Sequence, residues 1–143
     1  ITLDGDGQNN PNDIPKLIKM YNETNNKLIG GIRINRKDNY IKKISSVIAN
    51  NIRSFILKDN CKDTGCSLKI FDRKIFLSFP YFDGLHRFLP ALFKGYGYNI
   101  DFINVSHRQR KYGNSKYGTF DRLFKGVKDI FIVNNIIKKI NTK

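Results

Sequence analysis

Apolar runs of two kinds alternate along this chain of 143 residues. Short runs with the strand pattern cover residues 28–32, 67–71 and 99–105, and longer runs with helical spacing lie between and after them. Parallel strands need a crossover connection of a dozen or more residues, which a helix usually supplies. The alternation therefore predicts an α/β fold with a mostly parallel sheet flanked by helices.

The helical pattern covers residues 10–26, 41–56, 73–79, 85–96 and 120–140. The last of these segments has one apolar side and a cationic face with Lys125, Lys128, Lys138 and Lys139. It suits either packing against its own sheet or lying on a membrane surface. Residues 58–65 and 106–118 are polar and contain glycine, and they predict loops.

The first eight residues combine a β-prone run with two carboxylates at i and i+2, Asp4 and Asp6. The neighbouring glycines allow a sharp turn, which puts both acids at the mouth of the predicted strand. Two oxygen ligands there suit Mg²⁺ or Mn²⁺, which also takes waters and substrate phosphates. Acids at this spacing are common in surface turns as well, so the pair gains weight only from the rest of the chain.

The predicted first strand begins at Ile1 and is apolar. Such a strand needs neighbours on both sides. We therefore expect the chain to be the C-terminal part of a larger α/β domain, or a domain completed by another chain.

The net charge is +14, from 26 basic and 12 acidic residues. This excess favours an anionic partner, namely a nucleic acid, an anionic membrane surface or a phosphorylated substrate. A general preference for Lys, Asn and Ile explains it equally well. The sequence contains no run of 18 apolar residues, so it predicts no transmembrane helix.

Cys61 and Cys66 form a C-x4-C pair, and the two histidines, His86 and His107, are remote in sequence. A structural zinc site needs four ligands, usually at closer spacing. We interpret the cysteines as two half-buried thiols in a reducing compartment.

Three further segments carry polar side chains in a distinctive order. They are the acid-containing turn and strand at 62–71 (KDTGCSLKIF), the His-Arg pair within 84–90 (GLHRFLP), and the basic loop at 106–118 (SHRQRKYGNSKYG). Together with residues 4–8 and 31–33, this set resembles the family 2 glycosyltransferases of the GT-A fold. Within that family it is most similar to the dolichyl- or polyprenyl-phosphate sugar transferases, such as dolichol-phosphate mannosyltransferase. The match runs from Leu3 to about Gly126, and the D-x-G-C/S strand and the R-x-x-G-x-S-K loop are its most specific parts.

The resemblance implies a Rossmann-like GT-A fold with a mixed, mostly parallel sheet, from which the N-terminal nucleotide-binding half is missing. Residues 1–119 would be the C-terminal part of the catalytic domain, and residues 120–143 an amphipathic, basic C-terminal helix. The protein would lie at the cytoplasmic, inner face of the membrane as a peripheral protein.

The resemblance also implies a reaction: an inverting, metal-dependent transfer of a sugar from a GDP- or UDP-linked donor to a polyprenyl or dolichyl phosphate. Asp4, Asp6 and Gln8 would hold Mg²⁺ or Mn²⁺. The family's acceptor-phosphate positions correspond to Arg33, Lys43, Ser46, His86 and Arg87. The donor diphosphate and sugar would be bound by Gln8, Asp63, Arg110, Ser115 and Lys116, and the catalytic set would be Asp4, Asp6, Arg110 and Lys116. The acceptor is already an oxyanion at neutral pH, so no strong general base is required.

Some of these positions have simpler interpretations. His86 could be capped by the backbone at the start of a helix, and Asp63 could cap a turn instead of orienting the sugar. Eukaryotic-type members carry a carboxylate where this chain has Arg87 and Phe88, so acid assistance from there is not expected.

Two other functions fit parts of the sequence. A basic nucleic-acid-binding module would use Tyr112 and Tyr117 as stacking groups, but the basic residues are spread over several elements and no nucleic-acid-binding signature occurs. A glycosyltransferase acting on a glycan or protein hydroxyl would need a carboxylate base near the sugar. The cationic set favours the phosphate acceptor, with no nucleic acid as partner.

Overall fold

One mixed sheet of three strands, in the order β2-β1-β3, organises the computed structural model. The structure describes residues 1–34, 40–108 and 119–142, with only the backbone for residues 40–46 and 119–125. The central strand β1 (Leu28–Arg33) pairs in parallel with β3 (Ile100–Val105) along its full length. It pairs antiparallel with β2 (Lys69–Phe71) only over its first half. The expected α/β class is confirmed, and the sheet is mixed, with the parallel pairing the longer of the two.

Helices precede, connect and follow the strands. In chain order they are η1 (Pro11–Asp13), α1 (Ile14–Glu23), α2 (Tyr40–Leu57), α3 (Arg73–Leu77), η2 (Leu85–Arg87), α4 (Leu89–Gly95) and α5 (Thr119–Asn141). Asp72 begins α3 by accepting hydrogen bonds from the backbone amides of Lys74 and Ile75, as an N-cap does. Each predicted helical segment therefore contains a helix, with ends that shift by a few residues.

Two predicted elements were wrong in detail. The first residues do not form a strand, because only Thr2 pairs, as an isolated bridge to Lys69, before the chain turns at residues 5–7. The predicted helix at 85–96 is broken into η2 and α4 at Phe88, whose φ of −111° and ψ of 8° are not helical. Pro90 lies in the first turn of α4, where its missing N–H costs nothing.

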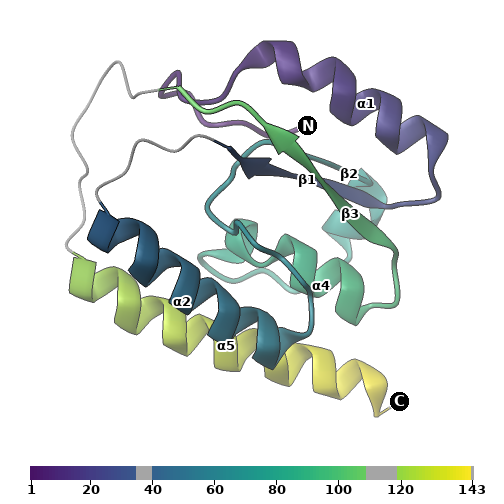
Figure 1. Cartoon of the computed structure of the whole chain (residues 1–143). Helices are drawn as coiled ribbons and strands as arrows, with labels where there is room; N and C mark the ends of the chain where they lie inside the picture. The colour runs from purple at the N-terminus through teal and green to yellow at the C-terminus, as the bar shows by residue number, and fades with distance from the viewer. Residues whose placement is uncertain (35–39, 109–118, 143) are drawn as a thin grey trace.

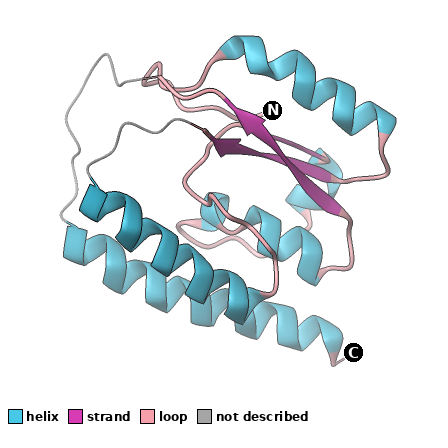
Figure 2. Ribbon diagram, in the orientation of Figure 1, coloured by secondary structure: helices cyan, strands magenta, loops and turns pink. Residues whose placement is uncertain are grey.

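The helices cover the sheet unevenly, as Figures 1 and 2 show. α1 lies across one face, α4 lies on the other, and α2 and α5 run side by side beyond α4. Leu17 and Ile29 belong to the core under α1, whereas Leu28 and Phe93 belong to the larger core that α4 and α5 share. Leu28 and Ile29 are neighbours on β1 and point to opposite faces, so the sheet separates the two cores.

Glycines in the central strand allow close packing of β3. A β-carbon at Gly30 would lie 2.8 Å from Cδ1 of Phe102, and one at Gly31 would lie 2.8 Å from Cγ2 of Val105. Both distances are shorter than a normal contact, so these positions exclude larger residues unless β3 moves.

The cysteines are free thiols and are more buried than expected, at 1% exposure each. Burial raises the pKa of Cys61 to about 11 and also raises the pKa of Cys66. Both thiols are therefore protonated and unreactive at neutral pH.

α5 packs chiefly on α4 and α2, and its fully buried Val133 belongs to the same core as Leu28 of β1. Among the described residues, none of the helices combines the length and the apolar character that crossing a membrane would require.

Candidate functional site

The carboxyl ends of β1 and β3 lie at the same edge of the sheet, beside the N-terminal segment (Figure 1). The amide of Ile34 donates to the carbonyl of Val105 at 3.0 Å, which keeps the two chains together just past the strands. In open α/β sheets, ligands bind in the crevice outside this edge. The candidate site is therefore described from here outward.

The acidic turn, residues 4–8, crosses this edge and is held at both ends. Ser67, just before β2, accepts hydrogen bonds at its Oγ from the amide of Asp4 at 3.1 Å and from Nδ2 of Asn9 at 2.7 Å. The amide of Arg108, just after β3, donates to the carbonyl of Gln8 at 2.9 Å. The turn thus connects the beginning of β2 to the end of β3.

The two acids of the turn differ in exposure. Asp4 is exposed and Asp6 is half-buried, and Oδ1 of Asp6 accepts a hydrogen bond from the amide of Gln8 at 3.1 Å. A β-carbon added at Gly5 or Gly7 would have no atom within 4 Å. Gly7 has a φ of +76°, a conformation that glycine adopts without strain. The two glycines of the turn are therefore not packed against other described residues.

Asp13 fixes the chain that leaves β3, a role that the sequence reasoning missed. Its carboxylate is buried and accepts hydrogen bonds from the amide of Ser106 at 2.8 Å, from Oγ of Ser106 at 2.6 Å and from Nζ of Lys16 at 3.1 Å. Burial acts to raise the pKa of Asp13, but these donors outweigh it and the pKa is lowered. The sequence did contain one indication of such a role, because Asp13 is an acid near the start of the predicted helix.

Arg33 and Asp63 form a bidentate ion pair at the end of β1. Asp63 Oδ2 accepts from Nε of Arg33 at 2.7 Å and from its amide at 3.1 Å, and Oδ1 accepts from NH2 at 2.7 Å. The arginine side chain is 15% exposed and the aspartate 5%. Two parallel hydrogen bonds fix the plane of the guanidinium, so Asp63 sets the orientation of Arg33.

Lys69 places a buried positive charge close to the acidic turn, and the sequence reasoning missed it too. Its backbone pairs with Thr2, and its Nζ donates to the carbonyl of Cys66. Burial lowers the pKa of Lys69, while negative charge on groups that include Asp63 and Asp4 acts in the opposite direction. The strand pattern of residues 67–71 places residue 69 in a strand but does not indicate that its charged side chain is buried.

His86 lies within electrostatic reach of the turn. Burial lowers the pKa of His86, and the positive charges of Arg87 and Lys69 lower it further. Asp4 and Asp83 act in the opposite direction. The histidine is thus near both a carboxylate of the turn and the buried lysine.

Arg87 is held by α5. Its NH2 donates to Oδ2 of Asp129 at 2.8 Å, and Asp129 is 5% exposed at its side chain. Gly84 is close to both groups, because a β-carbon there would lie 2.8 Å from NH2 of Arg87 and 2.9 Å from Oδ2 of Asp129. The pair anchors the turn before α4 to the C-terminal helix.

The remaining expected site residues are described only in part or not at all. Lys43 and Ser46 lie on α2, in the part described by its backbone alone. Arg110, Ser115 and Lys116 lie outside the described residues. The structure thus brings Asp4, Asp6, Gln8 and His86 to one edge, with Arg33 and Asp63 at the end of β1.

The donor set of the turn is small. No group of three or more His, Cys, Asp or Glu side chains that could hold a metal ion occurs within the described ranges. A site here would therefore consist of two carboxylates and an amide, and the other ligands of the ion would be water or substrate oxygens.

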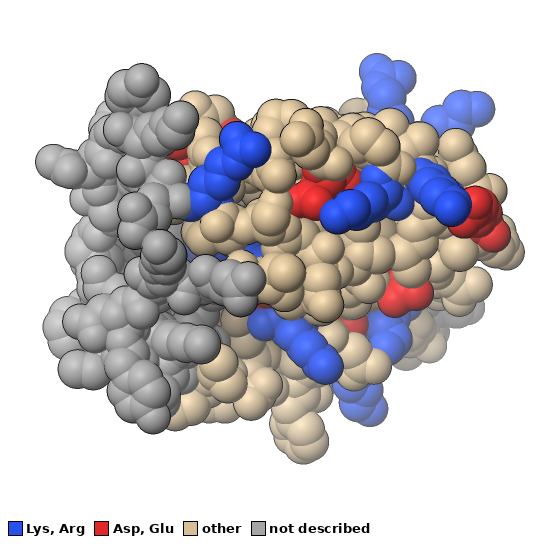
Figure 3. Space-filling model, turned by 45° about the horizontal axis from the view of Figure 1, so that its top comes forward, with Lys and Arg blue, Asp and Glu red and all other residues tan. Residues whose placement is uncertain are grey.

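Charge on the described surface is dispersed. On the face in Figure 3, lysines and arginines stand apart from one another, with acidic residues among them. On this face, the described basic residues form no continuous stripe.

Comparison with known proteins gives close matches to enzymes of lipid-linked sugar metabolism. The chain is 37% identical over 135 residues to a dodecaprenyl-phosphate galacturonate synthase of Rhizobium johnstonii, a match that covers 92% of this chain and 40% of the relative. It is 33% identical over 117 residues to an undecaprenyl-phosphate 4-deoxy-4-formamido-L-arabinose transferase of Serratia proteamaculans, covering 82% of this chain and 36% of the relative. The enzyme of the same name from Yersinia pestis is 32% identical over the same length.

No family model matches the chain. The chain spans about two fifths of the length of the curated relatives that it matches. Over most of its own length, it is a homologue of the polyprenyl-phosphate sugar transferases.

Proposed function

We propose that this chain carries part of the active site for the transfer of a sugar from a nucleotide sugar to a polyprenyl phosphate. The observation that carries the proposal is the acidic turn, fixed between Ser67 and Arg108 at the carboxyl edge of the parallel strands. The names of the homologues, which contain a polyprenyl phosphate and a sugar, support the substrate class. The activity is proposed for a protein that also supplies a nucleotide-base pocket, as the rest of a family 2, GT-A enzyme would.

In this proposal Asp4, Asp6 and Gln8 hold Mg²⁺ or Mn²⁺. Two carboxylates, one exposed and one half-buried, fit an ion that keeps waters and takes diphosphate oxygens as further ligands. When bound, the ion neutralises the charge that develops on the departing nucleotide diphosphate. The turn itself positions the two carboxylates, because its ends are fixed by Ser67 and Arg108.

The cations would position the two phosphorylated reactants against each other. Arg33, oriented by Asp63, would bind the acceptor phosphate, and we assign this orienting role to Asp63 instead of contact with the sugar. Lys43, Ser46, His86 and Arg87 would complete the acceptor side. Arg110, Ser115 and Lys116 would close over the donor diphosphate and exclude water, which suppresses hydrolysis of the donor.

The acceptor needs little activation. A phosphate monoester is ionised at neutral pH and attacks the anomeric carbon from the side opposite the leaving group, which inverts that carbon. The protein therefore has to hold two anions close together, a task for fixed positive charges and not for a strong base.

The acceptor lipid requires contact with a membrane, and one face of the protein suits this. We define the α2–α5 face by its exposed apolar side chains, which are Val47, Ile48, Ile52, Phe55 and Ile56 on α2 and Val127 and Phe131 on α5. Phe55 is 85% exposed and Phe131 is 63% exposed. Contiguous apolar surface marks an interaction site, and the two helices that carry these side chains run side by side. We propose that this face rests on the cytoplasmic surface of the membrane.

The experiment is an assay of the complete protein with membranes, Mn²⁺ and a panel of radiolabelled nucleotide sugars. The expected product is a labelled lipid that extracts into organic solvent. Asp6→Asn should abolish transfer without unfolding the protein, whereas Asp101→Asn, at an exposed carboxylate on β3, should leave it unchanged. Transfer that survives chelation of the metal would refute the metal's role, and a labelled glycan or protein in place of a lipid would refute the acceptor.

A further inference from the structure

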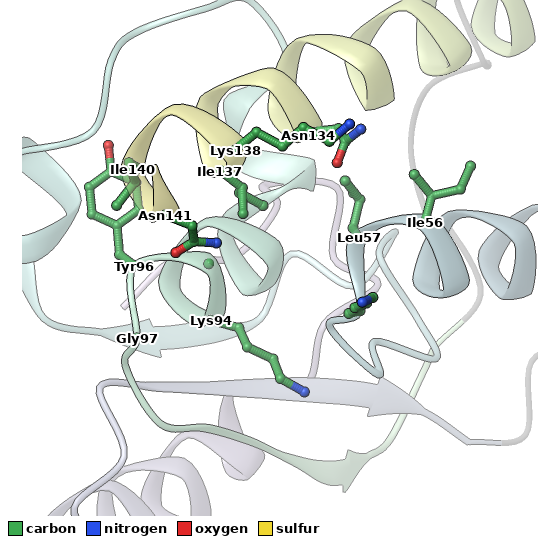
Figure 4. A pocket seen from close by; sticks show the side chains of 12 residues that line it. Ile56, Leu57, Lys94, Tyr96, Gly97, Asn134, Ile137, Lys138, Ile140 and Asn141 are labelled. Atoms are coloured by element: carbon green, nitrogen blue, oxygen red, sulfur yellow. The ribbon is translucent and has the colours of Figure 1, made fainter. Parts of the chain in front are cut away.

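A groove lies between the carboxyl ends of α2, α4 and α5 (Figure 4). Its volume is about 690 Å³, within the range of small-ligand sites. None of the candidate site residues described above lines it. Residues from the ends of all three helices line it, among them Ile56, Lys94 and Asn141.

The charged groups of this groove are all positive. Lys58, Lys94 and Lys138 come from three different segments, and none of the described Asp or Glu residues lines the groove. None of the three lysines forms an ion pair with a carboxylate of the described part of the chain. Three lysines around one hollow, without a carboxylate partner in the described part of the chain, outweigh the partial negative charge at the helix ends and favour an anionic ligand.

The groove also has apolar walls, and it adjoins the α2–α5 face. Ile137 and Ile140 from α5 line it together with Ile56 and Leu57 from α2. Ile56 is 40% exposed and belongs to the α2–α5 face as well. A ligand in the groove can therefore place a charged group near the lysines and an apolar part along that face.

Tight packing of α4 against α5 forms the floor of the groove. A β-carbon at Gly95 would lie 2.5 Å from Cγ1 of Ile137, so the glycine is what allows the two helices to approach. Gly97, with a φ of +85°, turns the chain away after α4. Figure 4 shows Asn141 and Ile137 projecting from α5 on the side that faces α4. The shape of the groove is thus set by the fold itself.

We propose that this groove binds the phosphate headgroup of an anionic membrane lipid, whose acyl chains lie along the α2–α5 face. The inference rests on the membrane contact proposed above. It adds a second phosphate site, separate from the acceptor site, which would fix the orientation of the protein on an anionic bilayer.

The test compares binding of the purified protein to phosphatidylcholine vesicles with and without phosphatidylglycerol, measured by flotation. A lysine near an anionic bilayer strengthens binding about fivefold, so the triple variant K58Q/K94Q/K138Q should bind the anionic vesicles roughly 100-fold more weakly. The matched triple K19Q/K27Q/K74Q removes the same charge elsewhere and should bind within about threefold of wild type, because distant charges are screened. Asn141→Phe adds bulk without changing charge and should also remove the preference for phosphatidylglycerol.

The outcomes separate this site from the wider proposal. If the wild type binds neither type of vesicle, both the membrane contact and the groove are wrong. If both triple variants weaken binding equally, the attraction is general charge and the groove has no special role. A parallel titration with inorganic phosphate, followed by NMR at Gly95 and Gly97, covers the other source of a phosphate. Saturable phosphate binding at the groove, with vesicle binding unaffected in K58Q/K94Q/K138Q, would assign the site to a soluble ligand and overturn the lipid.

Discussion

The ion pair between Arg33 and Asp63 gives a prediction whose size follows from the geometry. Asp63→Asn keeps the shape of the side chain but removes its charge and turns one acceptor into a donor. Three donors of Arg33 now bind this carboxylate at 2.7 to 3.1 Å, and the arginine side chain is only 15% exposed. Leaving one charge of a buried pair without its partner costs about 3–5 kcal/mol, and partial exposure of Arg33 places the expected loss near 3 kcal/mol.

For a chain of 143 residues the entropy of unfolding is about 0.3 kcal/mol per kelvin, so this loss should lower the Tm by about 10 °C. Urea unfolding followed by circular dichroism measures the free energy directly. Asp101→Asn, at an exposed position, is the control and should change it by less than about 0.5 kcal/mol.

A double-mutant cycle tests the cause. Replacing both partners, as Arg33→Met with Asp63→Leu, should recover about 2 kcal/mol relative to Asp63→Asn, because no buried charge is then left unpaired. A loss of less than 1 kcal/mol for Asp63→Asn would refute the reasoning, since it would mean that Arg33 is well solvated without Asp63.

Three further predictions concern packing, pH and membrane contact. Gly31→Ala should lower the free energy of unfolding by about 1–3 kcal/mol, because the new methyl group would overlap Cγ2 of Val105; urea unfolding measures it, and an unchanged midpoint would contradict it. The pKa of Asp13 is below its unfolded value, so its bonds to Ser106 stabilise the fold above about pH 4, and this stabilisation is lost as pH falls through the folded pKa. Urea titrations at a series of pH values measure the free energy of unfolding, which should fall less steeply with acid in Asp13→Asn than in wild type. The same dependence on pH in both proteins would exclude this role. Phe55→Ser should weaken vesicle binding roughly 30-fold without changing the Tm, because this exposed ring contributes about 2 kcal/mol only where it enters the bilayer. A lower Tm with unchanged vesicle binding would argue for a packing role.

Local patterns predicted the elements that are marked by a short apolar run or by apolar residues at helical spacing. β1 and β3 are short apolar runs between polar segments, and α2 and α5 repeat their apolar residues at helical spacing, so each was placed within a few residues of its observed ends. The apolar opening at Ile1 was misread as a strand because periodicity does not report hydrogen-bond partners. Only Thr2 has a partner there, since β2 itself is three residues long.

The candidate site was harder to predict from sequence, because its charged residues pair with partners that are far away in the chain. Asp63 is thirty positions from Arg33, and Arg87 is forty-two from Asp129, so neither pairing follows from spacing. The sequence allowed two roles for Asp63. Its contact with the guanidinium of Arg33 depends on how the 58–65 loop lies against the end of β1, which the sequence pattern does not report. Lys69 illustrates the same limit, because a lysine in a predicted strand is expected to face solvent and here it is 4% exposed.

The central claim is that the acidic turn binds a divalent cation at the carboxyl edge of the sheet. Substoichiometric Mn²⁺, added to the isotope-labelled chain, broadens the amide signals of residues near the ion. The account predicts selective loss of the signals of Gly5, Asp6 and Gln8, together with those of Ser67 and Arg108, and no such loss in Asp4→Asn/Asp6→Asn. Broadening centred elsewhere, such as at Asp72 or Asp101, or a pattern that is the same in that double variant, would contradict it.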